Sequence, residues 1–92
     1  MFVHAGFNDS IPNPFDDEKH MLWTCSKFYT NKLLKDKTII HGHCPITTRA
    51  CITAVKNKDK VINIDTGCVY IDKKDYGTLT AYDCSTDSLH FV

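Results

Sequence analysis

The apolar segments of this chain are short, and each is stopped by residues that break regular structure. Residues 38–41 have the pattern of a buried strand, which ends at Gly42 and Pro45. Residues 61–65 alternate between apolar and polar side chains and run into a Thr-Gly turn, which predicts a second strand. Two further strands are expected at 78–82 and 89–92.

One main helix is predicted to begin close to residue 17. Asp16 or Asp17 can accept hydrogen bonds from the backbone N–H groups at its start, and Glu18 suits the positive end of the helix dipole. Apolar side chains then recur at helical spacing along one face: Met21, Leu22, Cys25, Phe28, Tyr29 and Leu33. Residues 8–17 are predicted to form an ordered loop, because they are rich in Asn, Asp and Pro.

Together these segments predict an α+β fold with one main helix and a mixed, mostly antiparallel sheet. Residues 2–5 are expected to form a strand that ends at a glycine turn, residues 51–55 an edge strand, and the charged run 72–75 a hairpin connection. A chain of 92 residues is large enough for one domain only, so residues 1–92 are treated as one unit.

The charge balance and the hydrophobic pattern exclude several classes of partner. Eleven basic residues face eleven acidic residues, which gives no electrostatic reason to expect nucleic acid or an anionic membrane as a partner. The N-terminus has no charged region followed by an apolar stretch, and no apolar run is long enough to span a membrane. A cytoplasmic location is therefore predicted.

The five cysteines are an odd number, and no two stand at the C-x2-C spacing of zinc ribbons and redox motifs. In a reducing compartment such residues behave as small buried hydrophobes. No disulfide is predicted.

Two histidine turns carry the chemistry of the sequence. The segments His4-Ala5-Gly6 and His41-Gly42-His43-Cys44-Pro45 each place imidazole at the end of an apolar strand, beside a glycine that permits a sharp turn. Neutral imidazole is the commonest metal ligand among side chains. The residues alone therefore indicate a candidate metal site, with hydrogen-bonded structural histidines as the alternative.

Five motifs follow one another along the chain: Phe2-Val3-His4-Ala5-Gly6-Phe7, Met21-Leu22-Trp23, Ile39-Ile40-His41-Gly42-His43-Cys44-Pro45, Ile62-Asn63-Ile64-Asp65-Thr66-Gly67-Cys68 and Gly77-Thr78-Leu79-Thr80-Ala81. In this order they resemble the second half of the bacterial and phage serine/threonine phosphatases, calcineurin-like metallophosphoesterases related to diadenosine tetraphosphatase. The resemblance covers nearly the whole chain. It implies the C-terminal part of that family's two-sheet sandwich.

The resemblance implies that His4 and His43 are ligands of one of two divalent metal ions, Mn, Fe or Zn. It leaves His41 and Arg49 as candidates for a supporting contact or a phosphate contact, and Asp65 as a turn former or a site residue. In such an enzyme two metals about 3.5–4 Å apart activate a bridging water for attack on phosphorus. The implied substrate is a phosphorylated protein or a small phosphoester, and no catalytic side chain is assigned here.

The chain departs from the family pattern in ways that limit this expectation. The family's Gly-Asp-x-His, Gly-Asp-x-x-Asp-Arg-Gly and Gly-Asn-His-Glu motifs, which supply the other ligands, do not occur. Cys25 stands two residues after Trp23, where the family commonly has a phosphate-binding arginine. The chain alone is therefore expected to be inactive, and to associate with a separate N-terminal half or with itself.

Three rival interpretations stay open. The chain can be a binding or docking module without catalysis. The segment His43-Cys44-x4-Arg49 is one residue shorter than the His-Cys-x5-Arg loop of cysteine-dependent phosphatases, and Pro45 removes one of the N–H donors that cradle phosphate there. Finally, His4, His41, His43 and Cys44 together can form a structural zinc site.

Overall fold

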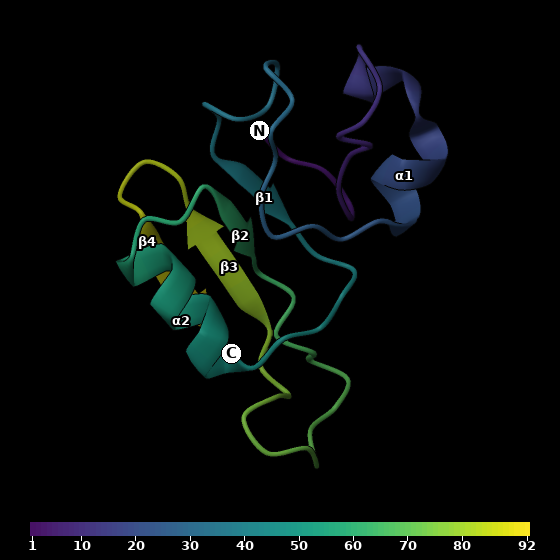
Figure 1. Cartoon of the computed structure of the whole chain (residues 1–92). Helices are drawn as coiled ribbons and strands as arrows, with labels where there is room; N and C mark the ends of the chain where they lie inside the picture. The colour runs from purple at the N-terminus through teal and green to yellow at the C-terminus, as the bar shows by residue number, and fades with distance from the viewer.

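The computed structural model describes all 92 residues and has an α+β architecture, as the sequence predicts at this coarse level. Its elements, in chain order, are the 3-10 helix η1 (Pro14–Asp16), α1 (Glu18–Trp23), β1 (Ile39–His41), α2 (Thr48–Lys56), β2 (Val61–Asn63), β3 (Thr80–Asp83) and β4 (Ser88–Phe91). Figure 1 shows α1 and α2 on opposite sides of the molecule, with β1, β2 and β3 between them. None of the helices is long and apolar enough to cross a membrane.

The strands form two separate small sheets rather than one mostly antiparallel sheet, so that part of the prediction is wrong. β1 and β2 pair in parallel, with Ile40 opposite Ile62, while β3 and β4 form an antiparallel hairpin with Tyr82 opposite Leu89. Parallel neighbours cannot be joined by a tight turn and need a crossover connection, usually a helix. α2 lies in that crossover and packs against β2.

The N-terminal segment lies beside β1 and extends the parallel pairing. The N–H of Ile40 donates to the carbonyl of Met1 (2.9 Å), and the N–H of Val3 donates to the carbonyl of Ile40 (3.1 Å). Beyond β1, the N–H of Gly42 donates to the carbonyl of His4 (2.9 Å). Only one bridge, Phe2 to Ile40, has the pairing of a strand, so the strand predicted at residues 2–5 is reduced to this bridge.

The predicted main helix is much shorter than its apolar pattern suggests. Asp17 does cap it, accepting from the N–H of His20 at 3.1 Å, but α1 ends at Trp23 and Thr24 has an extended backbone. The segment that follows is held by side chains from the preceding loop. The carboxylate of Asp9, more than twenty positions earlier in the chain, accepts from the N–H groups of Thr30 and Asn31, and these tertiary bonds hold the segment in a non-helical conformation.

A second helix, α2, occupies the place where an edge strand was predicted at residues 51–55. The β-branched residues Ile52, Thr53 and Val55 favour strands, which explains the wrong prediction. The helix begins where Thr47 accepts from the N–H of Ala50 at 3.1 Å. Its one buried residue is Cys51, whose thiol is free.

The charged run 72–75 does not connect a hairpin. It lies in a series of turns between β2 and β3 that projects beyond the helices and strands in Figure 1, while the β3–β4 hairpin turns at residues 84–87. Thr48 donates its backbone N–H to the carbonyl of Asp75 at 2.7 Å, which ties the projecting segment to the start of α2.

The core is small for a chain of this length. Only 13 of 92 residues are buried, and the main cluster consists of Phe7, Tyr29, Leu34 and Ile39. The accessible surface is 6123 Å², against about 5,400 Å² expected for a compact monomer of this mass. More large hydrophobic side chains are exposed than hydrophobic side chains are buried, fourteen against eight. The fold therefore leaves apolar surface uncovered.

Candidate metal and phosphoester site

His4 and His43 lie together although they are 39 positions apart in the chain. The Nε2 atom of His4 is 3.0 Å from the Nδ1 atom of His43, and the ring centroids are 4.7 Å apart. The arrangement follows from the pairing of the backbone, because His4 ends the N-terminal segment and His43 follows β1, its parallel neighbour. Parallel segments present their carboxyl ends at the same edge of a sheet, so both imidazoles reach one place.

His43 sits on an unusual backbone turn. Its φ is 72°, in the left-handed region that residues with a Cβ rarely adopt, and the N–H of Cys44 donates to the carbonyl of Gly42 at 2.9 Å. A hydrogen bond that spans three residues with such a φ at the centre defines a strained γ-turn. Strained conformations of this kind cost about 1–3 kcal/mol and cluster at functional sites.

Trp23 contacts the same imidazole from the end of α1. Its ring meets the ring of His43 edge to face, with centroids 5.3 Å apart, while 66% of the residue stays exposed. The tryptophan of the Met-Leu-Trp motif therefore lies against the histidine pair.

A disulfide joins Cys25 to Cys44, and the prediction that the chain has none is wrong. The two Cα atoms are 6.5 Å apart and the residues are 19 positions apart in sequence. Closing a loop of that length stabilises a fold by about 3 kcal/mol through the entropy of the unfolded chain. Sequence spacing alone carried no signal for this pair, because both cysteines also fit as buried hydrophobes. The other three cysteines are free: Cys51 is buried, and Cys68 and Cys84 are exposed.

The disulfide also removes two rival interpretations. Cys44 has no free thiolate to attack phosphorus, so the near match to a cysteine-dependent phosphatase loop is wrong for this structure. For the same reason Cys44 cannot complete a zinc site with His4, His41 and His43. No group of three or more His, Cys, Asp and Glu side chains in the chain is arranged to hold a metal ion.

His41 is buried and lies behind the pair. Its Nδ1 atom is 3.0 Å from the carbonyl oxygen of Gly42, which can only accept, so Nδ1 carries the proton and donates. Burial lowers the pKa of the His41 imidazole, although the Gly42 carbonyl and the Asp65 charge act in the opposite direction. A neutral His41 that braces the turn through Gly42 follows from this geometry.

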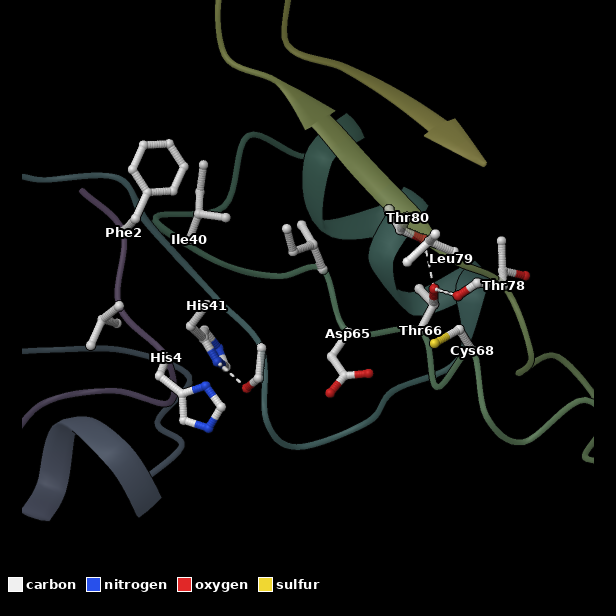
Figure 2. A pocket seen from close by; sticks show the side chains of 13 residues that line it. Phe2, His4, Ile40, His41, Asp65, Thr66, Cys68, Thr78, Leu79 and Thr80 are labelled. Atoms are coloured by element: carbon white, nitrogen blue, oxygen red, sulfur yellow. Dashed lines mark hydrogen bonds between the residues drawn. The ribbon is translucent and has the colours of Figure 1, made fainter. Parts of the chain in front are cut away.

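A cleft of about 380 Å³ opens beside these residues (Figure 2). Figure 2 shows His4 and His41 on one side of the cleft and Asp65 with Thr66 on the other. The Oδ1 atom of Asp65 accepts from the N–H of Gly67 at 3.0 Å, so this carboxylate does shape the turn after β2, and the same residue lines the cleft. The alternatives of turn former and site residue are therefore compatible.

Thr66 fixes the far side of the cleft to the start of β3. Its hydroxyl lies 2.5 Å from the carbonyl oxygen of Thr78 and 2.6 Å from the hydroxyl of Thr80. Arg49, by contrast, is exposed in the first turn of α2 and does not line the cleft. The structure thus brings His4, His41, His43 and Asp65 to one region and leaves Arg49 outside it.

No protein-family model, no curated protein and no solved structure matches this chain.

Proposed function

We propose that this chain supplies two histidine ligands, His4 and His43, to one divalent metal ion of a phosphoester hydrolase of the serine/threonine phosphatase type. The observation that carries the proposal is that the Nε2 atom of His4 and the Nδ1 atom of His43 lie 3.0 Å apart, although the two residues are far apart in the sequence. The order of the five motifs, which resembles that of this class of enzyme, supports the proposal. The proposed substrate is accordingly a phosphorylated protein or a small phosphoester.

The distance between the two nitrogens suits a shared metal ion. Two nitrogens at about 2.1 Å from one ion are about 3.0 Å apart at adjacent positions of an octahedron and about 3.4 Å apart in a tetrahedron. The observed 3.0 Å is close to both values, and it is also the distance of a hydrogen bond between the two rings, so it does not discriminate between Mn²⁺ and Zn²⁺. Without a metal the two rings form one hydrogen bond, whose donor depends on their tautomers.

Two ligands leave most positions of such an ion open. Because no third ligating side chain joins the pair within the chain, the remaining ligands come from water or from residues outside these 92. When bound, the metal supplies a hydroxide nucleophile and polarises the phosphoryl group. His4 and His43 would hold the ion, while His41, through its bond to the Gly42 carbonyl, and the γ-turn would fix the direction of the His43 ring.

Metal binding and hydrolysis are measured separately to test the proposal. In calorimetric titrations with Mn²⁺, we expect one site in the wild-type chain and a loss of at least about tenfold in affinity in both His4→Ala and His43→Ala, because each removes half of the protein ligands. His90→Ala is the matched control, since His90 is exposed on β4. With p-nitrophenyl phosphate and Mn²⁺, the chain alone is expected to show no hydrolysis.

Two results would contradict this proposal. Equal Mn²⁺ affinity in the wild-type chain and both variants would remove the histidine pair as a ligand set. Hydrolysis by the chain alone that disappears in His43→Ala would show that these residues assemble a complete site, so the idea of a half-site would be wrong.

A second candidate function is a docking module without catalysis, and the uncovered apolar surface favours it. Phe2 and Leu79 are largely exposed beside the cleft, and Val69 and Ile71 are largely exposed on the projecting turns. Contiguous exposed apolar side chains mark surfaces that bind other polypeptides. Absence of any Mn²⁺ binding by the wild-type chain would leave this candidate as the better account.

A further inference from the structure

The disulfide is placed where it can control the histidine pair. Cys44 directly follows His43, and Cys25 lies two residues after Trp23, the side chain that contacts the His43 ring. The bond therefore links the two segments that meet at this imidazole, one from the end of α1 and one from the turn after β1. No other covalent link between these segments exists in the chain.

The non-covalent support on the α1 side is weak. α1 has six residues and buries none of them fully. It is tied to the rest of the fold by the backbone bond from the N–H of Ala5 to the carbonyl of Met21, at 2.9 Å, and by the Met21 side chain, which packs against the core cluster. The carbonyl of Cys44, in contrast, is held by the side-chain amide of Asn63 at 2.6 Å. Opening the bridge would leave the His43 turn anchored on the β2 side and release the Trp23 side.

Both bridged cysteines line a second cavity of about 380 Å³, between the sheet and α2. They are half-buried, and Lys27 lies at the rim of the same cavity. The cavity gives a small thiol molecule a route to the bridge, and Lys27 and Asp59 both line it, so a zwitterionic thiol finds a partner for each of its charges. Reactive disulfides are those that a thiolate can reach.

The reduced form has a place for its thiol as well. The Sγ atom of Cys25 lies 3.7 Å from the carbonyl oxygen of Gly42. A disulfide sulfur carries no hydrogen and cannot donate there, whereas a thiol can donate a weak hydrogen bond. The same carbonyl receives the His41 Nδ1–H, so opening the bridge changes the bonding of the residue that begins the γ-turn.

We propose that the Cys25–Cys44 bridge is a thiol-exchange site for a low-molecular-weight thiol of the glutathione class, and that its redox state sets the position of His43 relative to Trp23 and His4. The thiolate attacks one sulfur of the bridge, forms a mixed disulfide and releases the other cysteine as a thiolate. A second thiolate then attacks the mixed disulfide, which yields two protein thiols and one oxidised thiol dimer. Thiol exchange at the bridge does not depend on metal binding. Only the expected effect on metal affinity rests on the proposed function.

The exchange is tested in the full chain carrying Cys68→Ser and Cys84→Ser, which removes the two exposed thiols. The protein is equilibrated in mixtures of reduced and oxidised glutathione, and each state is identified by alkylation and mass. We expect Cys25 and Cys44 to change state together within this range, and single Cys25→Ser or Cys44→Ser variants to form a mixed disulfide with glutathione. A bridge that resists excess reduced glutathione would overturn the proposal.

The effect on the histidines is read by proton NMR, as the nuclear Overhauser contact between the Trp23 and His43 rings. We expect the contact in the oxidised chain and its loss in the reduced chain, while the signals of the core around Leu34 keep the chemical shifts of the folded state. An unchanged contact, or unfolding of the whole chain on reduction, would show that the bridge is structural only.

Metal affinity gives the separate readout. In the Cys25→Ser, Cys44→Ser double variant we expect Mn²⁺ to bind about tenfold more weakly, because support of a ligand is lost rather than the ligand itself. The control is the Cys68→Ser, Cys84→Ser background. If reduction removes the ring contact but neither the oxidised nor the reduced chain binds Mn²⁺, the switch is retained and the metal site is rejected. If the ring contact is lost but the Mn²⁺ affinity is unchanged, control of the histidine pair by the bridge is rejected.

Discussion

Leu34→Ala is expected to lower the free energy of unfolding by about 2–5 kcal/mol, because it removes a fully buried side chain and leaves a cavity. Leu34 is 1% exposed and packs in the cluster with Phe7, Tyr29 and Ile39. A chain of 92 residues has a total stability of roughly 5–14 kcal/mol. The substitution therefore removes a large share of it.

The neighbouring Leu33 provides a matched control, since it has the same side chain at 38% exposure. Both residues lie in the turn that Asn31 organises, where the N–H of Leu33 donates to the Asn31 side chain and the N–H of Leu34 donates to its carbonyl. Urea unfolding of the two alanine variants compares them directly. We expect Leu33→Ala to cost less than about 1 kcal/mol. Equal losses would contradict the position of the core.

Gly6→Ala is expected to destabilise the fold by about 1–3 kcal/mol or more, because there is no room for a Cβ atom. That atom would overlap the carbonyl oxygen of Thr24 and lie 2.6 Å from the hydroxyl of Tyr29. The Thr24 oxygen belongs to the backbone and cannot move alone. The Tyr29 hydroxyl accepts from the N–H of Phe7, so displacing it also breaks a buried hydrogen bond.

Gly42→Ala is the matched substitution in the other histidine turn. A Cβ there would meet the Asp65 side chain at 3.5 Å, an ordinary contact, and we expect little loss of stability. Thermal unfolding compares the stability of the two variants, and Mn²⁺ titration is then carried out on each variant that is still folded. A stable Gly6→Ala protein would show that the first turn is more open than the structure has it.

The sequence predicted the strands better than the helices, for physical reasons. The segments at 39–41 and 61–63 are apolar, β-branched and bounded by turn residues, so local preference and tertiary structure agree. For residues 24–33 local preference and tertiary structure disagree: the apolar spacing favours a helix, but the Asp9 carboxylate accepts from the backbone N–H of Thr30, and the Tyr29 hydroxyl accepts from the N–H of Phe7. α2 was missed because its β-branched residues favour strands, whereas the parallel pairing of β1 and β2 needs a crossover.

The candidate site was predicted only in part. Strand-end histidines beside glycines indicated His4, His41 and His43, the resemblance selected His4 and His43 among them, and the structure brings these two together. Their metal-binding role stays a prediction. The support of the pair was not predictable, because it depends on contacts between segments far apart in sequence: the edge of Trp23 on His43, the bridge from Cys25 to Cys44, and the burial of His41. Spacing along a sequence carries no information on such contacts.

The most direct test of the histidine pair is long-range ¹H–¹⁵N NMR of all five imidazoles during titration with Zn²⁺, a diamagnetic ion. The structure predicts that the Nε2 signal of His4 and the Nδ1 signal of His43 move together to metal-bound positions, while His20, His41 and His90 keep theirs. A response from other imidazoles, or from only one of the two, would contradict a metal held between His4 and His43.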